Sequence, residues 1–122
     1  MGQKILVVDD DPGIITVLQA LLEEEGFEVL TAYDGAWGSA LALAEEPDLI
    51  ITDFLMPVMG GYGLILGVRA SGEKMPIIVC CGPTSESNRD LLLHSGANCI
   101  IEKPFDNDFL VSKVRELLAV AG

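Results

Sequence analysis

Five short apolar stretches recur along the chain, and each is followed by a segment with helical periodicity. The apolar stretches are Lys4–Val8, Glu28–Ala32, Leu49–Thr52, Ile77–Cys81 and Cys99–Glu102. The first, third and fourth are apolar almost throughout, which is typical of strands that are covered on both faces of a parallel sheet. The pattern therefore predicts five β-strands that alternate with helices.

The first two helices have clear boundaries. Asp11-Pro12 predicts a helix start, with an aspartate N-cap and a proline at the first helical position. Gly26 ends this helix, and Pro47 follows the end of the second one. The inward stripe of the first helix is Ile14, Ile15, Leu18, Leu21 and Leu22. We expect the second helix to face inward with Trp37, Ala40, Leu41 and Ala44.

Three more helices are predicted, near Tyr62–Ala70, Ser85–His94 and Asp106–Ala119. The first of them carries Gly63 and Gly67, which makes it intrinsically weak. The second ends at Gly96. The inward residues of the last are Leu110, Val114, Leu117 and Leu118.

Five βα units joined by short connections predict an α/β protein with a doubly wound parallel sheet and right-handed crossovers. Ligands of such sheets bind beyond the carboxyl ends of the strands, at the point where the strand order reverses. The chemistry of this chain is therefore expected in the residues that directly follow each strand.

Carboxylates and one lysine follow three of the predicted strands. Asp9 and Asp10 follow the first, Asp53 the third and Lys103 the fifth. Asp11 is assigned to the helix cap. Three carboxylates at one sheet edge repel one another unless a cation lies among them, and carboxylate oxygens are ligands that Mg²⁺ prefers. Together with a lysine, they form the parts of a phosphoryl-transfer site with an aspartate nucleophile.

Five motifs make the sequence resemble the receiver domain of bacterial two-component response regulators. They are "ILVVDDDP", "DFLMPVMGG", "MPIIV", "SGA" and "KPF", in this order and at compatible spacings. The resemblance covers residues 1–122 and leaves no stretch for an output domain. It implies a flavodoxin-like sheet of strand order 2-1-3-4-5 with five helices. It also implies a cis bond between Lys103 and Pro104, and a signalling domain rather than an enzyme.

The resemblance assigns a role to each residue of the acidic edge. Asp53 is implied to accept a phosphoryl group from the phosphohistidine of a sensor histidine kinase or phosphotransfer protein. Asp9, Asp10, Asp53 and the backbone carbonyl of Leu55 are implied to hold Mg²⁺, with Asp9 acting through water. Lys103 is implied to contact the phosphoryl oxygens.

Two switch positions of receivers are altered in this chain. Cys81 stands where receivers normally carry Ser or Thr, and a thiol is a much weaker donor than a hydroxyl. Ile100 stands where Tyr or Phe is usual. We therefore predict that phosphoryl acceptance survives and that the response downstream of it is altered. Thr84 or Ser85 supplies a substitute hydroxyl only if the loop folds back.

Two further departures concern loops. Gly60 stands where Asp commonly caps the third helix, and Pro83 stiffens the loop that follows Cys81. Cys80 and Cys81 are neighbours in a strand and point to opposite faces, and no other Cys or His is near in sequence, so neither a disulfide nor a zinc site is expected. Cys80 is expected to be a buried small apolar side chain.

Composition excludes several other functions. The formal net charge is −12, from 19 acidic residues against 7 Lys and Arg, which argues against direct binding of nucleic acid or anionic membranes. Three cysteines, an odd number, favour a reducing compartment over a disulfide framework. We expect a cytoplasmic protein with no membrane span.

Two rival functions remain open. The altered Cys81 and Ile100 favour a receiver-fold interaction module that works without phosphorylation. "ILVVDDDPG" also resembles the first motif of haloacid-dehalogenase-type phosphatases, although Pro12-Gly13 departs from that motif.

His94 is expected near the end of the fourth helix, where a cation suits the helix dipole. Leu91–Leu93 offers more apolar residues than one inward stripe needs. One of them is expected on the face formed by the fourth helix, fifth strand and fifth helix, which receivers use for dimerisation or downstream proteins.

Overall fold

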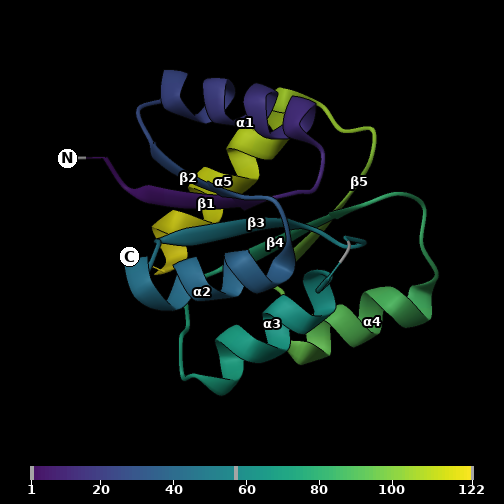
Figure 1. Ribbon diagram of the computed structural model, residues 1–122. Helices are drawn as coiled ribbons and strands as arrows, with labels where there is room; N and C mark the ends of the chain where they lie inside the picture. The colour runs from purple at the N-terminus through teal and green to yellow at the C-terminus, as the bar shows by residue number, and fades with distance from the viewer. Residues whose placement is uncertain (1, 57, 122) are drawn as a thin grey trace.

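A computed structural model describes residues 2–56 and 58–121, and it shows a single parallel sheet between two layers of helices (Figure 1). The strands are β1 (Lys4–Val8), β2 (Glu28–Ala32), β3 (Leu49–Asp53), β4 (Ile77–Cys81) and β5 (Cys99–Glu102). Their order is β2-β1-β3-β4-β5, and all neighbours pair in parallel. The predicted fold is confirmed. β3 is one residue longer than expected and includes Asp53.

Alternate residues of each strand enter two separate cores. Ile5 and Val7 of β1 belong to one buried cluster, whereas Leu6 and Val8 belong to the other. This alternation follows from the two-residue period of a strand. Because both faces are covered, β1, β3 and β4 need apolar side chains in both directions, which explains their continuous runs.

Helices α1 (Pro12–Glu24) and α5 (Asn107–Ala121) cover one face of the sheet (Figure 1). Their fully buried residues match the predicted stripes. These residues are Ile15, Leu18 and Leu22 of α1 and Leu110, Val114 and Leu118 of α5. The Asp11 carboxylate accepts a hydrogen bond from the Gly13 amide at 2.8 Å, so its predicted capping role is confirmed.

Helices α2 (Gly35–Glu45), α3 (Gly61–Ala70) and α4 (Glu86–Ser95) cover the other face (Figure 1). The predicted inward stripe of α2 is wrong for three of its four residues, and only Leu41 packs against the core. Its buried residues are Gly35, Gly38 and Ala42, while Trp37 is 46% exposed and Ala40 and Ala44 are also exposed. A Cβ at Gly38 would lie 2.8 Å from a Val8 side-chain carbon, so the helix packs on β1 through its smallest residues.

The helix ends confirm several local expectations. Gly60 precedes α3 and offers no side-chain cap, as expected for a weak helix. The Ser85 hydroxyl caps α4 by accepting the Asn88 amide hydrogen, and Gly96 ends that helix with φ +126°. His94 lies in the last turn of α4, where its Nδ1 is 2.8 Å from the Asp90 carbonyl oxygen.

No helix in the two described stretches combines the length and the apolar character needed to cross a membrane.

Candidate functional site

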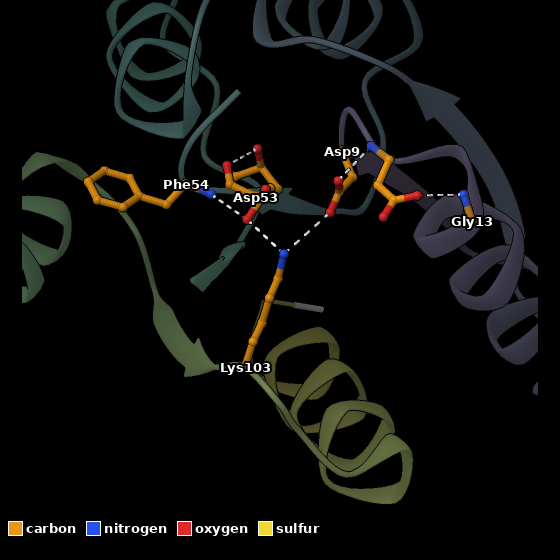
Figure 2. Close-up of polar contacts among 7 residues, drawn as sticks. Asp9, Gly13, Asp53, Phe54 and Lys103 are labelled. Carbon is orange, nitrogen blue, oxygen red and sulfur yellow. Dashed lines mark hydrogen bonds and ion pairs between the residues drawn. The ribbon is translucent and has the colours of Figure 1, made fainter. Parts of the chain in front are cut away.

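The carboxyl ends of β1, β3 and β5 bring the three predicted site segments together. Lys103 follows β5 and extends between Asp53 at the end of β3 and Asp9 after β1 (Figure 2). Its Nζ lies 3.0 Å from Asp53 Oδ1 and 3.7 Å from Asp9 Oδ2. The residues that the sequence places at one sheet edge therefore form one cluster of opposite charges.

Two hydrogen-bond donors hold the Asp53 side chain at the carboxyl edge of the sheet. Its Oδ1 accepts hydrogen bonds from Lys103 Nζ and from the Phe54 backbone amide, both at 3.0 Å (Figure 2). Within the described residues, neither donor reaches Oδ2 and no other hydrogen bond to that atom is present. With one oxygen held and the other left without a donor, the carboxylate is fixed in orientation and open to react.

Asp9 is nearly buried, with 4% of its surface exposed. Burial raises the pKa of its carboxyl group above 3.8, and the negative charge of Asp53 acts in the same direction. A hydrogen bond from the Asp11 amide at 2.9 Å and the charge of Lys103 oppose this rise without cancelling it. Ionisation of Asp9 therefore lowers the stability of the folded protein.

Asp10 completes an acidic group that suits a metal ion. It is exposed, and one carboxylate oxygen each from Asp9, Asp10 and Asp53 lie within 4.8 Å of one another. Three convergent carboxylates of graded burial are a fitting donor set for a hard divalent cation such as Mg²⁺. Leu55 follows Asp53 by two residues and is 75% exposed, so the chain after β3 is open to solvent at this point.

Lys103 supplies the positive charge of the site. Burial alone would lower its pKa, but the hydrogen bond and charge of Asp53, together with the charge of Asp9, raise the pKa above its ordinary value. The ammonium group is therefore fully charged at neutral pH. The peptide bond from Lys103 to Pro104 is cis, as predicted.

The loop between β3 and α3 folds tightly against Asp53. The Gly61 amide donates to the Phe54 carbonyl oxygen at 2.8 Å. A Cβ at Gly61 would lie 2.5 Å from the Asp53 carbonyl oxygen, and one at Gly60 would lie 2.8 Å from that of Phe54. The missing cap residue at position 60 thus coincides with a place where the backbone passes too close for a side chain.

A cavity of about 580 Å³ opens from Asp53 toward the β4–α4 loop. It is lined by Asp53, Phe54, Leu55, Cys81, Gly82, Pro83, Thr84, Ser85, Asn88 and Lys103. Cys81 is buried, and burial raises the pKa of its thiol, so the group is a neutral thiol at neutral pH. The structure places this altered position beside Asp53 and Lys103.

The remaining singled-out side chains lie in the cores. Cys80 is 3% exposed and packs in the α1/α5 core, where burial raises the pKa of its thiol to about 12. The expectation of a buried apolar role is confirmed. Ile100 is half-buried and packs against the core under α2, α3 and α4, as does Phe54.

Two contributors to the site were not anticipated from the sequence. The Phe54 amide reaches the Asp53 carboxylate, and the Asn88 side chain lines the cavity. A backbone amide carries no sequence signal. Asn88 lies three residues past the Ser85 cap, within the first turn of α4, and its position follows only from how α4 meets the sheet.

Fold and site together define a doubly wound α/β domain with an acidic cluster and a lysine at the carboxyl edge of its sheet, and comparison with known proteins identifies its family. Residues 5–115 match the response regulator receiver domain. The chain is 37% identical over 119 residues to the transcriptional regulatory protein PrrA of Mycobacterium tuberculosis, covering 98% of this chain and 51% of that protein. It is 36% identical to the alkaline phosphatase synthesis transcriptional regulatory protein PhoP of Bacillus subtilis, covering 97% and 49%. The chain belongs to the receiver domain family of two-component response regulators, and it spans about half the length of these relatives.

Solved structures agree with this assignment. A CheY-like receiver domain protein from Methanospirillum hungatei superposes with a TM-score of 0.94 at 31% identity, covering 99% of this chain and 97% of that one. The receiver domain of a sensor histidine kinase from Pseudomonas aeruginosa superposes with a TM-score of 0.88 at 30% identity, covering 98% and 99%. That structure is described with a magnesium ion coordinated in its active site cleft.

Proposed function

We propose that this receiver domain accepts a phosphoryl group on Asp53 from the phosphohistidine of a sensor histidine kinase or phosphotransfer protein. The observation that carries the proposal is the arrangement of Asp53, which has one carboxylate oxygen held by two donors and the other without one. In the step, Asp53 Oδ2 forms the new P–O bond as the P–N bond of the donor breaks. The leaving imidazole keeps the electron pair of that bond and takes up a proton.

The residues around Asp53 have separate tasks in this step. Lys103 already lies 3.0 Å from Oδ1, and its ammonium group would balance the charge of the incoming phosphoryl oxygens. The Phe54 amide holds Oδ1 and so fixes which oxygen faces the donor. Preorganised donors of this kind need no rearrangement when charge develops, which is why they lower a barrier.

Mg²⁺ fits the acidic group because three carboxylates converge there with only one lysine among them. We assign its ligands as Asp9, Asp10, Asp53 and the backbone carbonyl of Leu55, with Asp9 acting through water. When bound, the ion would neutralise the carboxylates and the phosphoryl oxygens at once.

A direct test is mass spectrometry of the intact chain after incubation with a phosphoryl donor such as acetyl phosphate. The expected result is a single added phosphoryl group that needs Mg²⁺ and is absent from Asp53→Asn. Asp48→Asn is a matched control, since Asp48 lies on another part of the molecule, near Lys4. Labelling that persists without Asp53 would contradict the assignment of the acceptor.

A groove beside the site suits the donor protein. It has a volume of about 480 Å³ and lies between the start of α1 and the β5–α5 connection. Ile14, Val17 and Phe105 give it an apolar lining, and Lys103 borders both this groove and the acceptor cavity. A helix of the donor seated here would bring its phosphohistidine to the edge of the sheet.

The second face proposed for partners is formed by α4, β5 and α5. Ile100, Phe105 and Phe109 line a groove of about 550 Å³ there, and Phe109 is 46% exposed. Leu92 is buried while Leu91 and Leu93 are exposed, so the apolar run does supply surplus apolar surface. A second copy of the chain or a downstream protein would bind this face.

An interaction module that works without phosphorylation is the alternative, favoured by the buried thiol of Cys81 and by Ile100. The two functions differ in their response to beryllofluoride, a phosphoryl mimic. A phosphoacceptor gains thermal stability from beryllofluoride with Mg²⁺, because a ligand of the folded state raises the melting temperature. The alternative predicts no such gain.

A further inference from the structure

The β4–α4 loop forms the wall of the acceptor cavity that faces Asp53. Gly82–Ser85 connect β4 to α4, and these residues line the same 580 Å³ cavity as Asp53 and Lys103. A phosphoryl group on Asp53 would have three oxygens, and those turned toward the loop would need donors from it. The loop side chains therefore decide how the phosphorylated state is held.

Cys81 is poorly suited to that task. Its side chain is a buried neutral thiol, and S–H groups are weak hydrogen-bond donors. Lys103 comes from the end of β5, and its Nζ lies 3.0 Å from Asp53 Oδ1 (Figure 2). Strong side-chain donors on the loop side of the described cavity are confined to Thr84, Ser85 and Asn88.

Thr84 is the residue best prepared to donate. Asn88 Nδ2 donates to Thr84 Oγ1 at 3.2 Å, which occupies an acceptor position of the hydroxyl and leaves its proton available. Thr84 is also half-buried. Ser85 Oγ likewise accepts a hydrogen bond, from the Asn88 amide at 3.1 Å, and caps α4, but Ser85 is exposed where Thr84 is half-buried.

We propose that the Thr84 hydroxyl binds the phosphoryl group on Asp53 and thereby couples phosphorylation to the start of α4. The inference rests on the proposed function of Asp53. A Cβ built at Gly82 would meet nothing within 4 Å, so no packed neighbour holds the loop at that residue. Because Asn88 holds Thr84 and belongs to the first turn of α4, a shift of Thr84 toward Asp53 would move that turn as well.

The test compares the beryllofluoride affinity of the whole chain, in the presence of Mg²⁺, by isothermal titration calorimetry. Thr84→Val keeps the shape of the side chain and removes the hydroxyl, so we expect affinity to fall by roughly ten- to a hundredfold. Thr84→Ser retains the hydroxyl and is expected to bind within about threefold of wild type. Ser87→Ala is the matched control, because Ser87 lies in the same first turn of α4 and does not line the cavity, so the affinity should be unchanged.

Amide chemical shifts supply a second readout. In wild type and Thr84→Ser, beryllofluoride is expected to shift the Asn88 amide resonances, whereas in Thr84→Val this shift is lost. Wild-type affinity in Thr84→Val, or an equal loss in Ser87→Ala, would overturn the role of Thr84 and leave the proposed function standing. If the wild-type chain shows no Asp53-dependent binding, the proposed function fails and this inference fails with it.

Discussion

The burial of Asp9 shows how one side chain can make the stability of the folded protein depend on pH. It is 4% exposed, and its carboxylate faces Asp53 as well as Lys103. Burial and the neighbouring carboxylate raise its pKa, so the ionised form is less favourable in the folded chain than in the unfolded one. Without a metal ion, the folded protein therefore carries an electrostatic penalty that unfolding relieves.

This penalty predicts a pH-dependent effect of Asp9→Asn. Because the folded-state pKa lies above 3.8, ionisation of Asp9 removes stability as pH rises from 3.8 through the raised pKa. In metal-free buffer the variant should melt at a higher temperature than wild type at pH 7. The advantage should shrink as pH falls toward 3.8. Thermal melts across this range, with Asp90→Asn as a control for net charge, would contradict the account if the two variants behaved alike.

Gly61 makes a second prediction at the scale of one residue. A Cβ there would lie 2.5 Å from the Asp53 carbonyl oxygen, so Gly61→Ala must push the backbone of the acceptor apart from α3. We expect a loss of roughly 1–3 kcal/mol in the free energy of unfolding, as for other overpacked sites. Gly82→Ala is the control, since that position has open space. Urea denaturation measures both, and equal stability of the two variants would refute the contact.

The sequence predicts which residues meet at the site and leaves their environments open. Asp9, Asp53 and Lys103 could be placed together because parallel strands end at one edge. The near-complete burial of Asp9 could not, because it depends on tertiary packing at the end of β1, which no local sequence pattern records. The same holds for Thr84, whose partner Asn88 is fixed by the cap of α4.

Helix α2 shows why hydrophobic periodicity can choose the wrong face. Trp37 and Leu41 dominate the pattern, yet the buried stripe is Gly35, Gly38 and Ala42. Close contact with Val8 and Leu64 leaves no room for a Cβ at Gly38. The space between two elements decides which face is buried, and a pattern of apolar residues does not record that space.

Arg69 ties α3 to the turn that leads into β5. Its guanidinium donates to the carbonyl oxygens of Gly96 and Glu73, and to Asn98 Oδ1. The same Asn98 oxygen accepts the amide hydrogen of Ile77 at the start of β4. One planar side chain thus joins three elements at the end of the sheet opposite the acidic site.

We expect Arg69→Lys to cost about 1–3 kcal/mol of unfolding free energy, because one ammonium group cannot replace the separate donors of a guanidinium. Phosphoryl acceptance on Asp53 should be retained, since Arg69 lies at the other end of the sheet. Denaturant unfolding and the intact-mass assay test the two halves of this expectation. A variant as stable as wild type would show that the contacts contribute little.

At the scale of the whole molecule, the net charge of −12 means that any added cation stabilises the fold to some extent. The stabilisation by Mg²⁺ bound at a specific site must therefore be separated from that by salt in general. Screening by any salt reduces repulsion among surface carboxylates. The group of Asp9, Asp10 and Asp53 adds local repulsion, which a divalent cation bound among the three carboxylates would relieve.

We therefore predict that Mg²⁺ raises the melting temperature more than NaCl of equal ionic strength. Stabilisation of about 2.7 kcal/mol is expected when Mg²⁺ is a hundredfold above its dissociation constant. Asp10→Asn should lose the excess and keep the salt effect, because Asp10 is exposed and contributes to the metal group alone. Identical responses of wild type to both salts would contradict a specific site.

Trp37 of α2 is exposed although the sequence pattern predicts it to face inward, and this has a practical consequence. Trp37 is the single tryptophan of the chain, and it lies partly in solvent with its ring 5.6 Å from that of Tyr33. Two residues before it, the Gly35 amide donates to the Met59 carbonyl oxygen in the loop that follows Asp53. A rearrangement of that loop would act on the start of α2, so the fluorescence of the indole is a label-free signal with which changes at the proposed acceptor site can be sought.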